Sequence, residues 1–131
     1  MAKFEKYEFE GLEFLCRGWD TSRAWGHEVF VIDGALEVAH YRVRYYNRTW
    51  EMYKFQSAMY GALDDYKKNE LARYIRNKKI EMGLIEWDSD AHCEIDRPFK
   101  RGQKKKLIEE FEQSELGQKI AKIKEHIHEG K

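Results

Sequence analysis

The chain has 131 residues, of which 42% are hydrophobic and 15% aromatic, and this composition excludes a disordered protein. Lysine plus arginine and aspartate plus glutamate number 24 each, so the formal net charge is zero, which disfavours a dedicated nucleic-acid binder with a basic excess. No run approaches the roughly 20 apolar residues that span a bilayer, so we expect no membrane association.

Cysteine content and the first residues indicate a cytoplasmic protein. Cys16 and Cys93 are too few for a disulfide framework, so reduced thiols are the expected state. The residues from Met1 to Lys6 contain no apolar signal segment. No Pro- or Gly-rich linker and no internal repeat divides the chain, and we therefore expect one domain over residues 1–131.

Residues 1–46 are predicted to form an antiparallel sheet of three to four strands. Two short alternating runs flank Gly11, which indicates a tight bend or a bulge there. Residues 18–23 have the composition of a loop. A further strand is expected over residues 27–32.

A hairpin is predicted at Asp33-Gly34. This dipeptide suits a type I′ turn, because both central residues of that turn need positive φ. The returning strand should run from Ala35 to Tyr46. Its alternation changes parity near Ala39, which a bulge would explain.

Residues 47–87 are predicted to be mainly helical. Asn47 is a candidate N-cap, with Thr49 as the alternative, and Gly83 is the expected C-cap. The pattern leaves open whether one long helix or two cover residues 48–82. Apolar residues recur every three or four positions and should face the core: Met52, Phe55, Met59, Ala62 and Tyr66.

A charged loop over residues 88–103 should lead into a C-terminal amphipathic helix over residues 104–131, which Gly117 would weaken. The predicted fold class is α+β, with an N-terminal antiparallel sheet packed on a long helix. The apolar side of the last helix comprises Leu107, Ile108, Phe111, Leu116, Ile120, Ile123 and Ile127.

Known catalytic motifs are missing from the sequence. It contains no phosphate-binding glycine loop, no dinucleotide fingerprint, no G-x-S-x-G elbow and no H-E-x-x-H helix. We therefore expect no enzymatic activity and no cofactor.

One acidic string invites a metal hypothesis. Acidic residues and a histidine alternate over residues 88–96, so an extended strand would place these side chains on one side. The string lacks the EF-hand spacing, and a solvated acidic loop is the favoured interpretation, so we expect no metal. The candidate ligands are Asp88, Asp90, His92, Glu94 and Asp96.

A basic run follows directly and is a candidate binding site for phosphates or for an acidic protein surface. The structural alternative is that the run neutralises the acidic string. Lysines at a helix N-terminus oppose the macrodipole, which makes a partner more attractive. The candidate binding residues are Arg97, Lys100, Arg101, Lys104, Lys105 and Lys106.

Arg42 and Arg44 form a further candidate site, because arginines on a strand can grip a nucleic-acid backbone. The structural interpretation is favoured: Tyr41, Val43 and Tyr45 face the core while the arginines face solvent. Trp50 is a candidate binding residue at the border of the core.

Two segments carry a resemblance, one from Gly18 to His27 and one from Tyr45 to Glu51 running into Phe55-Gln56-Ser57. They resemble segments of short uncharacterised proteins of phages and mobile elements of Gram-positive bacteria. The likeness covers residues 7–66 and brings no catalytic residues. It implies a role in phage–host conflict, where small proteins, anti-CRISPR proteins among them, bind and disable host defence complexes.

The leading hypothesis is therefore a non-catalytic inhibitor that acts in the host-cell cytoplasm. Its expected partner is a host defence protein or ribonucleoprotein complex, with weak nucleic-acid contact. The alternative is a small nucleic-acid-binding accessory protein that uses Arg42, Arg44 and residues 97–106. A metal-dependent enzyme built on residues 88–96 is the third class considered.

Overall fold

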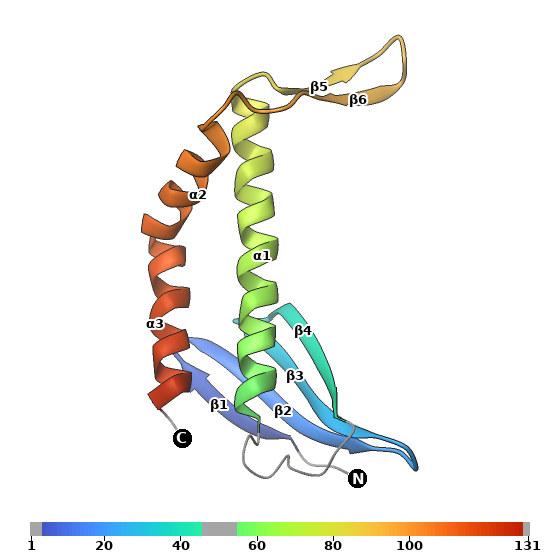
Figure 1. Cartoon of the computed structure of the whole chain (residues 1–131), viewed down its shortest axis with the longest axis vertical. Helices are drawn as coiled ribbons and strands as arrows, with labels where there is room; N and C mark the ends of the chain where they lie inside the picture. The colour runs from blue at the N-terminus through green and yellow to red at the C-terminus, as the bar shows by residue number, and fades with distance from the viewer. Residues whose placement is uncertain (1–3, 46–54, 130–131) are drawn as a thin grey trace. The chain divides into compact units, whose positions relative to one another are not determined.

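The computed structural model describes residues 4–45 and 55–129 and has the predicted α+β architecture (Figure 1). The chain divides into two compact units, one of residues 1–67 with 119–131 and one of residues 68–118. The strands are β1 (Glu5–Phe9), β2 (Leu12–Asp20), β3 (Trp25–Asp33), β4 (Leu36–Tyr45), β5 (Ile85–Asp88) and β6 (Cys93–Asp96). The helices are α1 (Gln56–Glu81), α2 (Gln103–Gln113) and α3 (Glu115–Glu129).

The sheet of the first unit is an antiparallel meander in which each strand pairs with the next, in the order β1-β2-β3-β4. The predicted bend at Gly11 is confirmed. Glu10 and Gly11 both have positive φ, 50° and 85°, as a type I′ hairpin turn requires. Phe9 and Leu12 flank this turn as the last pair of the ladder.

The hairpin after β3 is confirmed, but its predicted turn type is wrong. Asp33 pairs with Leu36, so Gly34 and Ala35 are the central residues. Gly34 has φ 65°, whereas Ala35 is not among the described residues with positive φ, and this pattern is typical of type II′. The predicted bulge is confirmed, since the register shifts between Val31 and Ile32, opposite residues 37–39.

The loop predicted over residues 18–23 is too long. Gly18 pairs with His27 and Trp19 with Gly26, so β2 continues to Asp20. Pairing with β3 overrides the loop-like composition of Gly18-Trp19-Asp20. The remaining connection is closed by a backbone hydrogen bond of 2.7 Å from Thr21 N to the carbonyl oxygen of Ala24.

α1 is one continuous helix, which answers the question that the sequence left open. The proposed caps Asn47 and Thr49 lie outside the described residues, as does Met52. The predicted C-cap is confirmed. Gly83 has φ 76°, and its N–H donates to Ile80 O while Leu84 N–H donates to Lys79 O, the two bonds of a Schellman motif.

The core of the first unit lies between one face of the sheet and the helices. A Cβ at Gly61 would overlap the ring of Tyr41, so α1 packs closely on β4. Gln56 Nε2 donates to Ile127 O over 2.8 Å, which fastens α3 to α1. The buried side chains include Leu12, Phe14, Cys16, Val29, Val31, Ala58, Met59, Ala62, Leu63, Tyr66, Ile120, Ile123 and Ile127.

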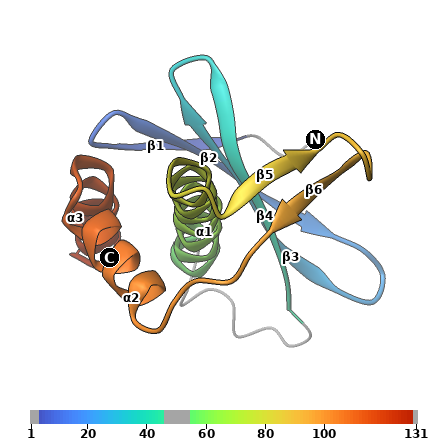
Figure 2. The ribbon, with the colours of Figure 1, turned by 90° about the horizontal axis from the view of Figure 1, so that it is seen from above.

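The predicted loop over residues 88–103 is wrong for its middle part, because β5 and β6 form an antiparallel hairpin in the second unit (Figure 2). The turn between them has a local cause. Asp88 Oδ1 accepts hydrogen bonds from the N–H groups of Asp90 and Ala91, and His92 adopts φ 51°.

The predicted single helix over residues 104–131 is also wrong. Ser114 is extended, with φ −68° and ψ 163°, and separates α2 from α3. Its Oγ accepts a hydrogen bond of 3.1 Å from Gly117 N, so Ser114 is the N-cap of α3. A Cβ at Gly117 would overlap the carbonyl oxygen of Phe111, and glycine therefore permits this close turn.

Within residues 4–45 and 55–129, no helix combines the length and apolar character needed to cross a bilayer.

Candidate functional site

The predicted binding residues fall into two groups that belong to different units. Arg42 and Arg44 lie on β4 in the first unit. The basic run lies in the second unit, before and within the first turn of α2. Trp50 lies outside the described residues.

In the first unit, Arg42 and Arg44 are exposed on the sheet face opposite to the one that Tyr41 presents to α1. The register places Trp19, Gly26 and Arg44 side by side on three adjacent strands. The indole of Trp19 rests on Gly26, where a Cβ would collide with it. Trp19, which the sequence predicts to lie in a loop, is therefore a neighbour of the two arginines on the sheet.

Both arginines contact this indole. The guanidinium carbon of Arg42 lies 4.2 Å from the ring centroid of Trp19, and that of Arg44 lies 5.8 Å from it. A guanidinium over an indole is a favourable cation–π arrangement. We call Trp19, Arg42 and Arg44 the Arg–Trp patch.

Glu28 lies next to the Arg–Trp patch and is 8% exposed. Its Oε2 accepts a hydrogen bond of 2.7 Å from Arg17 Nε, and its Oε1 lies 2.7 Å from His40 Nε2. Burial opposes the charge of Glu28, but the hydrogen bonds from Arg17 and His40 outweigh it and lower the pKa of the carboxyl group. Glu28 is therefore an ionised, fully engaged acceptor.

Aromatic contacts extend along the same face. The imidazole of His40 stacks on Phe30 with centroids 4.3 Å apart and planes 1° from parallel. Arg17 lies over the ring of Phe4 at 5.0 Å. The guanidinium groups of Arg17, Arg42 and Arg44 on this face are thus held by aromatic or carboxylate neighbours.

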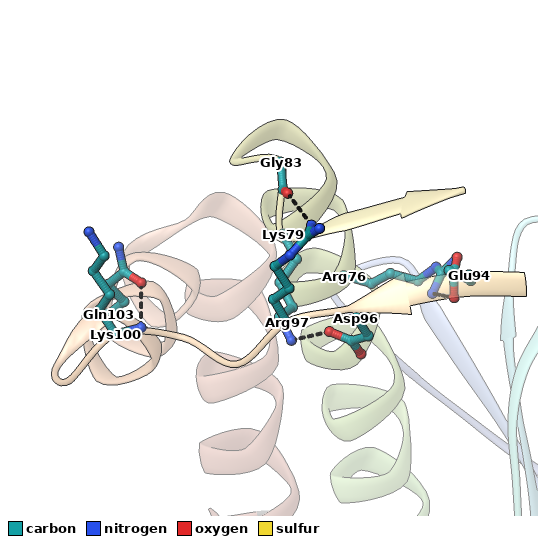
Figure 3. A network of polar contacts seen from close by, with 8 residues as sticks. All are labelled: Arg76, Lys79, Gly83, Glu94, Asp96, Arg97, Lys100 and Gln103. Atoms are coloured by element: carbon teal, nitrogen blue, oxygen red, sulfur yellow. Dashed lines mark hydrogen bonds and ion pairs between the residues drawn. The ribbon is translucent and has the colours of Figure 1, made fainter. Parts of the chain in front are cut away.

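In the second unit, the acidic string is divided by the β5–β6 turn, so its residues do not line one side of a single strand. Glu94 pairs with Arg76, and Asp96 pairs with Lys79 (Figure 3). No group of three or more His, Cys, Asp or Glu side chains that could hold a metal occurs within the described part of the chain. The absence of a bound metal stays a prediction.

The basic run is also divided by the structure. Arg97 Nη2 forms an ion pair of 2.7 Å with Glu86, and Arg97 Nη1 donates to the carbonyl oxygen of Gly83. The backbone N–H of Lys100 donates to Gln103 Oε1 over 2.8 Å, which shapes the turn before α2. Arg97 is therefore a structural residue of the hairpin.

The other cations of the run remain exposed, and we call them the basic turn: Lys100, Arg101, Lys104, Lys105 and Lys106. None of their side chains forms an ion pair with a residue in the described ranges. The first turn of α2 contains no acidic residue, and its N-cap residue, Gly102, has no side chain that could cap the helix. The basic turn is thus a concentrated positive surface.

The two cysteines differ in environment. Cys16 is buried in the sheet and Cys93 is exposed, and neither is in a disulfide. Burial raises the pKa of the Cys16 thiol to about 12, so this thiol is protonated at neutral pH and is a poor nucleophile.

Acid should destabilise the fold in two stages. Burial lowers the pKa of His27 in the folded protein below its ordinary value of 6.5. As the pH falls below about 6.5, the unfolded state therefore binds a proton at His27 before the folded state does, and the free energy of unfolding decreases. Glu28 has a lowered pKa as well, so its contribution is present above pH 4.5 and is lost as pH falls through its folded-state pKa. The melting temperature should therefore fall first as His27 titrates, and should fall again at lower pH as Glu28 becomes protonated.

The variant His27→Gln is the control for the first stage. It should flatten the melting temperature between about pH 7 and about pH 5, while the loss at lower pH persists. An unchanged slope in this variant would show that His27 does not titrate as its burial implies.

No protein-family model, curated protein or solved structure matches this chain. The Arg–Trp patch and the basic turn are the two surface features that bear on function.

Proposed function

We propose that this protein is a non-catalytic binding protein that docks on a bacterial defence complex and inhibits it, as the resemblance to proteins of phages and mobile elements implies. The observation that carries the proposal is the basic turn. Its cations are exposed, adjacent and without ion-pair partners among the described residues. Such a surface complements an acidic protein surface or a phosphate-lined groove.

The surroundings of the basic turn support a docking role. In the same unit, the acidic side chains of Glu86, Glu94 and Asp96 are each paired with a cation of α1 or of the hairpin. These three carboxylates therefore form no ion pair with the basic turn. Because the net charge of the whole chain is zero, attraction to a partner should act at short range and favour a specific interface.

The environment of two reactive groups supports a non-catalytic role. Cys16 is protonated at neutral pH, and the oxygens of Glu28 are occupied by Arg17 and His40. A nucleophile or a general base needs a free, activated atom within reach of a substrate. Neither group offers one.

A plasmid-interference assay tests the proposal. Cells with an active CRISPR–Cas system that express this protein should accept a targeted plasmid more efficiently than cells without it. Reversing the charge at Lys104, Lys105 and Lys106 to glutamate should abolish this protection, because like charges across an interface repel. Recovery of the defence complex by affinity purification, in parallel with nuclease treatment, should fall in the same variant.

The matched control reverses the charge at Lys68, Arg73 and Lys119, outside the basic turn, and should retain protection. Equal loss in both variants would mean that bulk charge, and not the basic turn, governs the effect. Full protection by the Lys104/Lys105/Lys106 variant would exclude the basic turn as the docking surface.

A second candidate function, a nucleic-acid-binding accessory protein, is favoured by the exposed guanidinium groups of Arg42 and Arg44, which can contact backbone phosphates. Titrations of duplex and single-stranded oligonucleotides at two salt concentrations distinguish the two functions. For the inhibitor, we expect the isolated protein to bind with dissociation constants of about 10⁻⁴–10⁻⁶ M at physiological salt. Submicromolar binding with a steep salt dependence, reduced by loss of Arg42 and Arg44, would favour the second candidate.

A further inference from the structure

We propose that the Arg–Trp patch is a docking surface for an acidic protein segment, whose carboxylates would be bound by Arg42 and Arg44. This inference rests on the proposed function, because it names a surface of the first unit through which a binding protein would act. It assigns a role to Trp19 as the platform that positions both guanidinium groups.

The two arginines of the patch are preorganised. Both arginines extend from β4, and their guanidinium groups lie over the indole of Trp19, which itself rests on Gly26. An arginine held in this way loses less side-chain entropy when it forms two parallel hydrogen bonds with a carboxylate. The planar fork of each group matches a carboxylate and leaves its N–H edges available.

The positive charges of the two arginines have no ion-pair partner among the described residues. Glu28 lies directly across from Arg42 in the β3–β4 register and would be its natural ion-pair partner. Its two oxygens are instead used by Arg17 and His40. Within the described residues, neither Arg42 nor Arg44 forms an ion pair, so the positive charge of the patch is available to an outside acid.

The covered aromatic rings of this face favour an acidic protein over a single-stranded nucleic acid. Base recognition needs an open aromatic face. Arg42 already lies over the Trp19 ring at 4.2 Å, and His40 lies parallel to the Phe30 ring. The Trp19 ring supports guanidinium groups and the Phe30 ring is covered by an imidazole, so neither is an open platform for bases, which favours a partner that supplies carboxylates alone.

A binding experiment with two probes of equal charge tests this inference. The full-length protein is titrated with a fluorescein-labelled oligoglutamate peptide and, separately, with a labelled oligothymidylate. We expect tighter binding of the peptide. The variant Arg42→Gln/Arg44→Gln should bind the peptide about tenfold more weakly or worse, since two charge-assisted contacts are lost. The variant Arg42→Lys/Arg44→Lys should also lose affinity, because lysine keeps the charge but not the fork.

The charge-matched control is Lys68→Gln/Arg73→Gln, two exposed positions on α1 in the second unit, and it should bind like the wild type. Equal losses in this control and in the arginine variant would overturn the inference, as would tighter binding of the oligothymidylate. Full affinity in the lysine variant would overturn the role of the planar fork. Thermal unfolding of each variant verifies that it is folded.

The outcome is separable from that of the proposed function. Peptide binding is measured on the isolated protein without any defence complex, and the basic turn is intact in every variant used. If only the docking role of the Arg–Trp patch is wrong, the plasmid-interference assay should still show protection. If only the inhibitor function is wrong, the peptide titration should still show the loss in the arginine variants.

Discussion

Replacing Gly61 with alanine should destabilise the protein by about 1–3 kcal/mol, because a new Cβ at this position overlaps the ring of Tyr41. The expected sign is informative. In the interior of a solvent-exposed helix, the same exchange stabilises by about 1 kcal/mol. Urea denaturation followed by circular dichroism measures the difference in free energy of unfolding.

Two controls make this result specific to the contact between α1 and β4. Asn69→Ala, at an exposed position of the same helix, should be neutral or slightly stabilising. In a Tyr41→Ser background, the loss caused by Gly61→Ala should shrink, as a double-mutant cycle would reveal. A stabilising Gly61→Ala exchange would show that α1 does not approach β4 closely at this point.

Replacing Gly117 with valine should cost about 3 kcal/mol, because its Cβ would overlap backbone atoms of Phe111 and Glu112 that cannot rotate away. The turn between α2 and α3 would have to open, and the hydrogen bond from Gly117 N to Ser114 Oγ would be lost. Chemical denaturation and helical circular dichroism should both report the change.

Ala121→Val is the control for this exchange, since it places the same β-branched side chain at an exposed position of α3. Its effect should remain within the small helix-propensity penalty of valine, at most about 0.7 kcal/mol. Similar losses at positions 117 and 121 would mean that the chain does not need glycine for the turn between the helices.

Much of the first unit could be predicted from local signals. The Asp33-Gly34 hairpin and the bulge near Ala39 follow from turn chemistry and from side-chain alternation, and the structure confirms both. The turn type was wrong because it depends on which residues form the last pair of the ladder. A single residue of register moved the turn from Asp33-Gly34 to Gly34-Ala35.

The helix break and the second hairpin had weaker signals. A serine followed by an acidic first-turn residue is a recognised helix start, and Ser114-Glu115 fits that pattern inside an uninterrupted apolar stripe. The sequence predicts a loop for β6 because the strand lies within the acidic string of residues 88–96. Its pairing depends on the turn that Asp88 and His92 form, and composition does not reveal it.

The sequence predicts only part of the candidate site. The alternation of residues in β4 predicts that Arg42 and Arg44 face solvent, and both are exposed. Their contact with Trp19 joins residues of β2 and β4 across β3, so it requires the register of three strands. The space for the indole comes from Gly26, whose role is visible only once the strands are aligned.

The first unit is discontinuous in sequence, since α3 returns to it after residues 68–118 have formed a unit of their own. A ribosome therefore releases the whole meander and most of α1 before the residues that complete their core, Ile120, Ile123 and Ile127, have been synthesised. Until then, the apolar side of the nascent sheet lacks part of its cover and is open to chaperones or to self-association. A stop codon that removes α3 would leave this state permanent, so a truncated product should be a substrate for proteolysis instead of a smaller working protein.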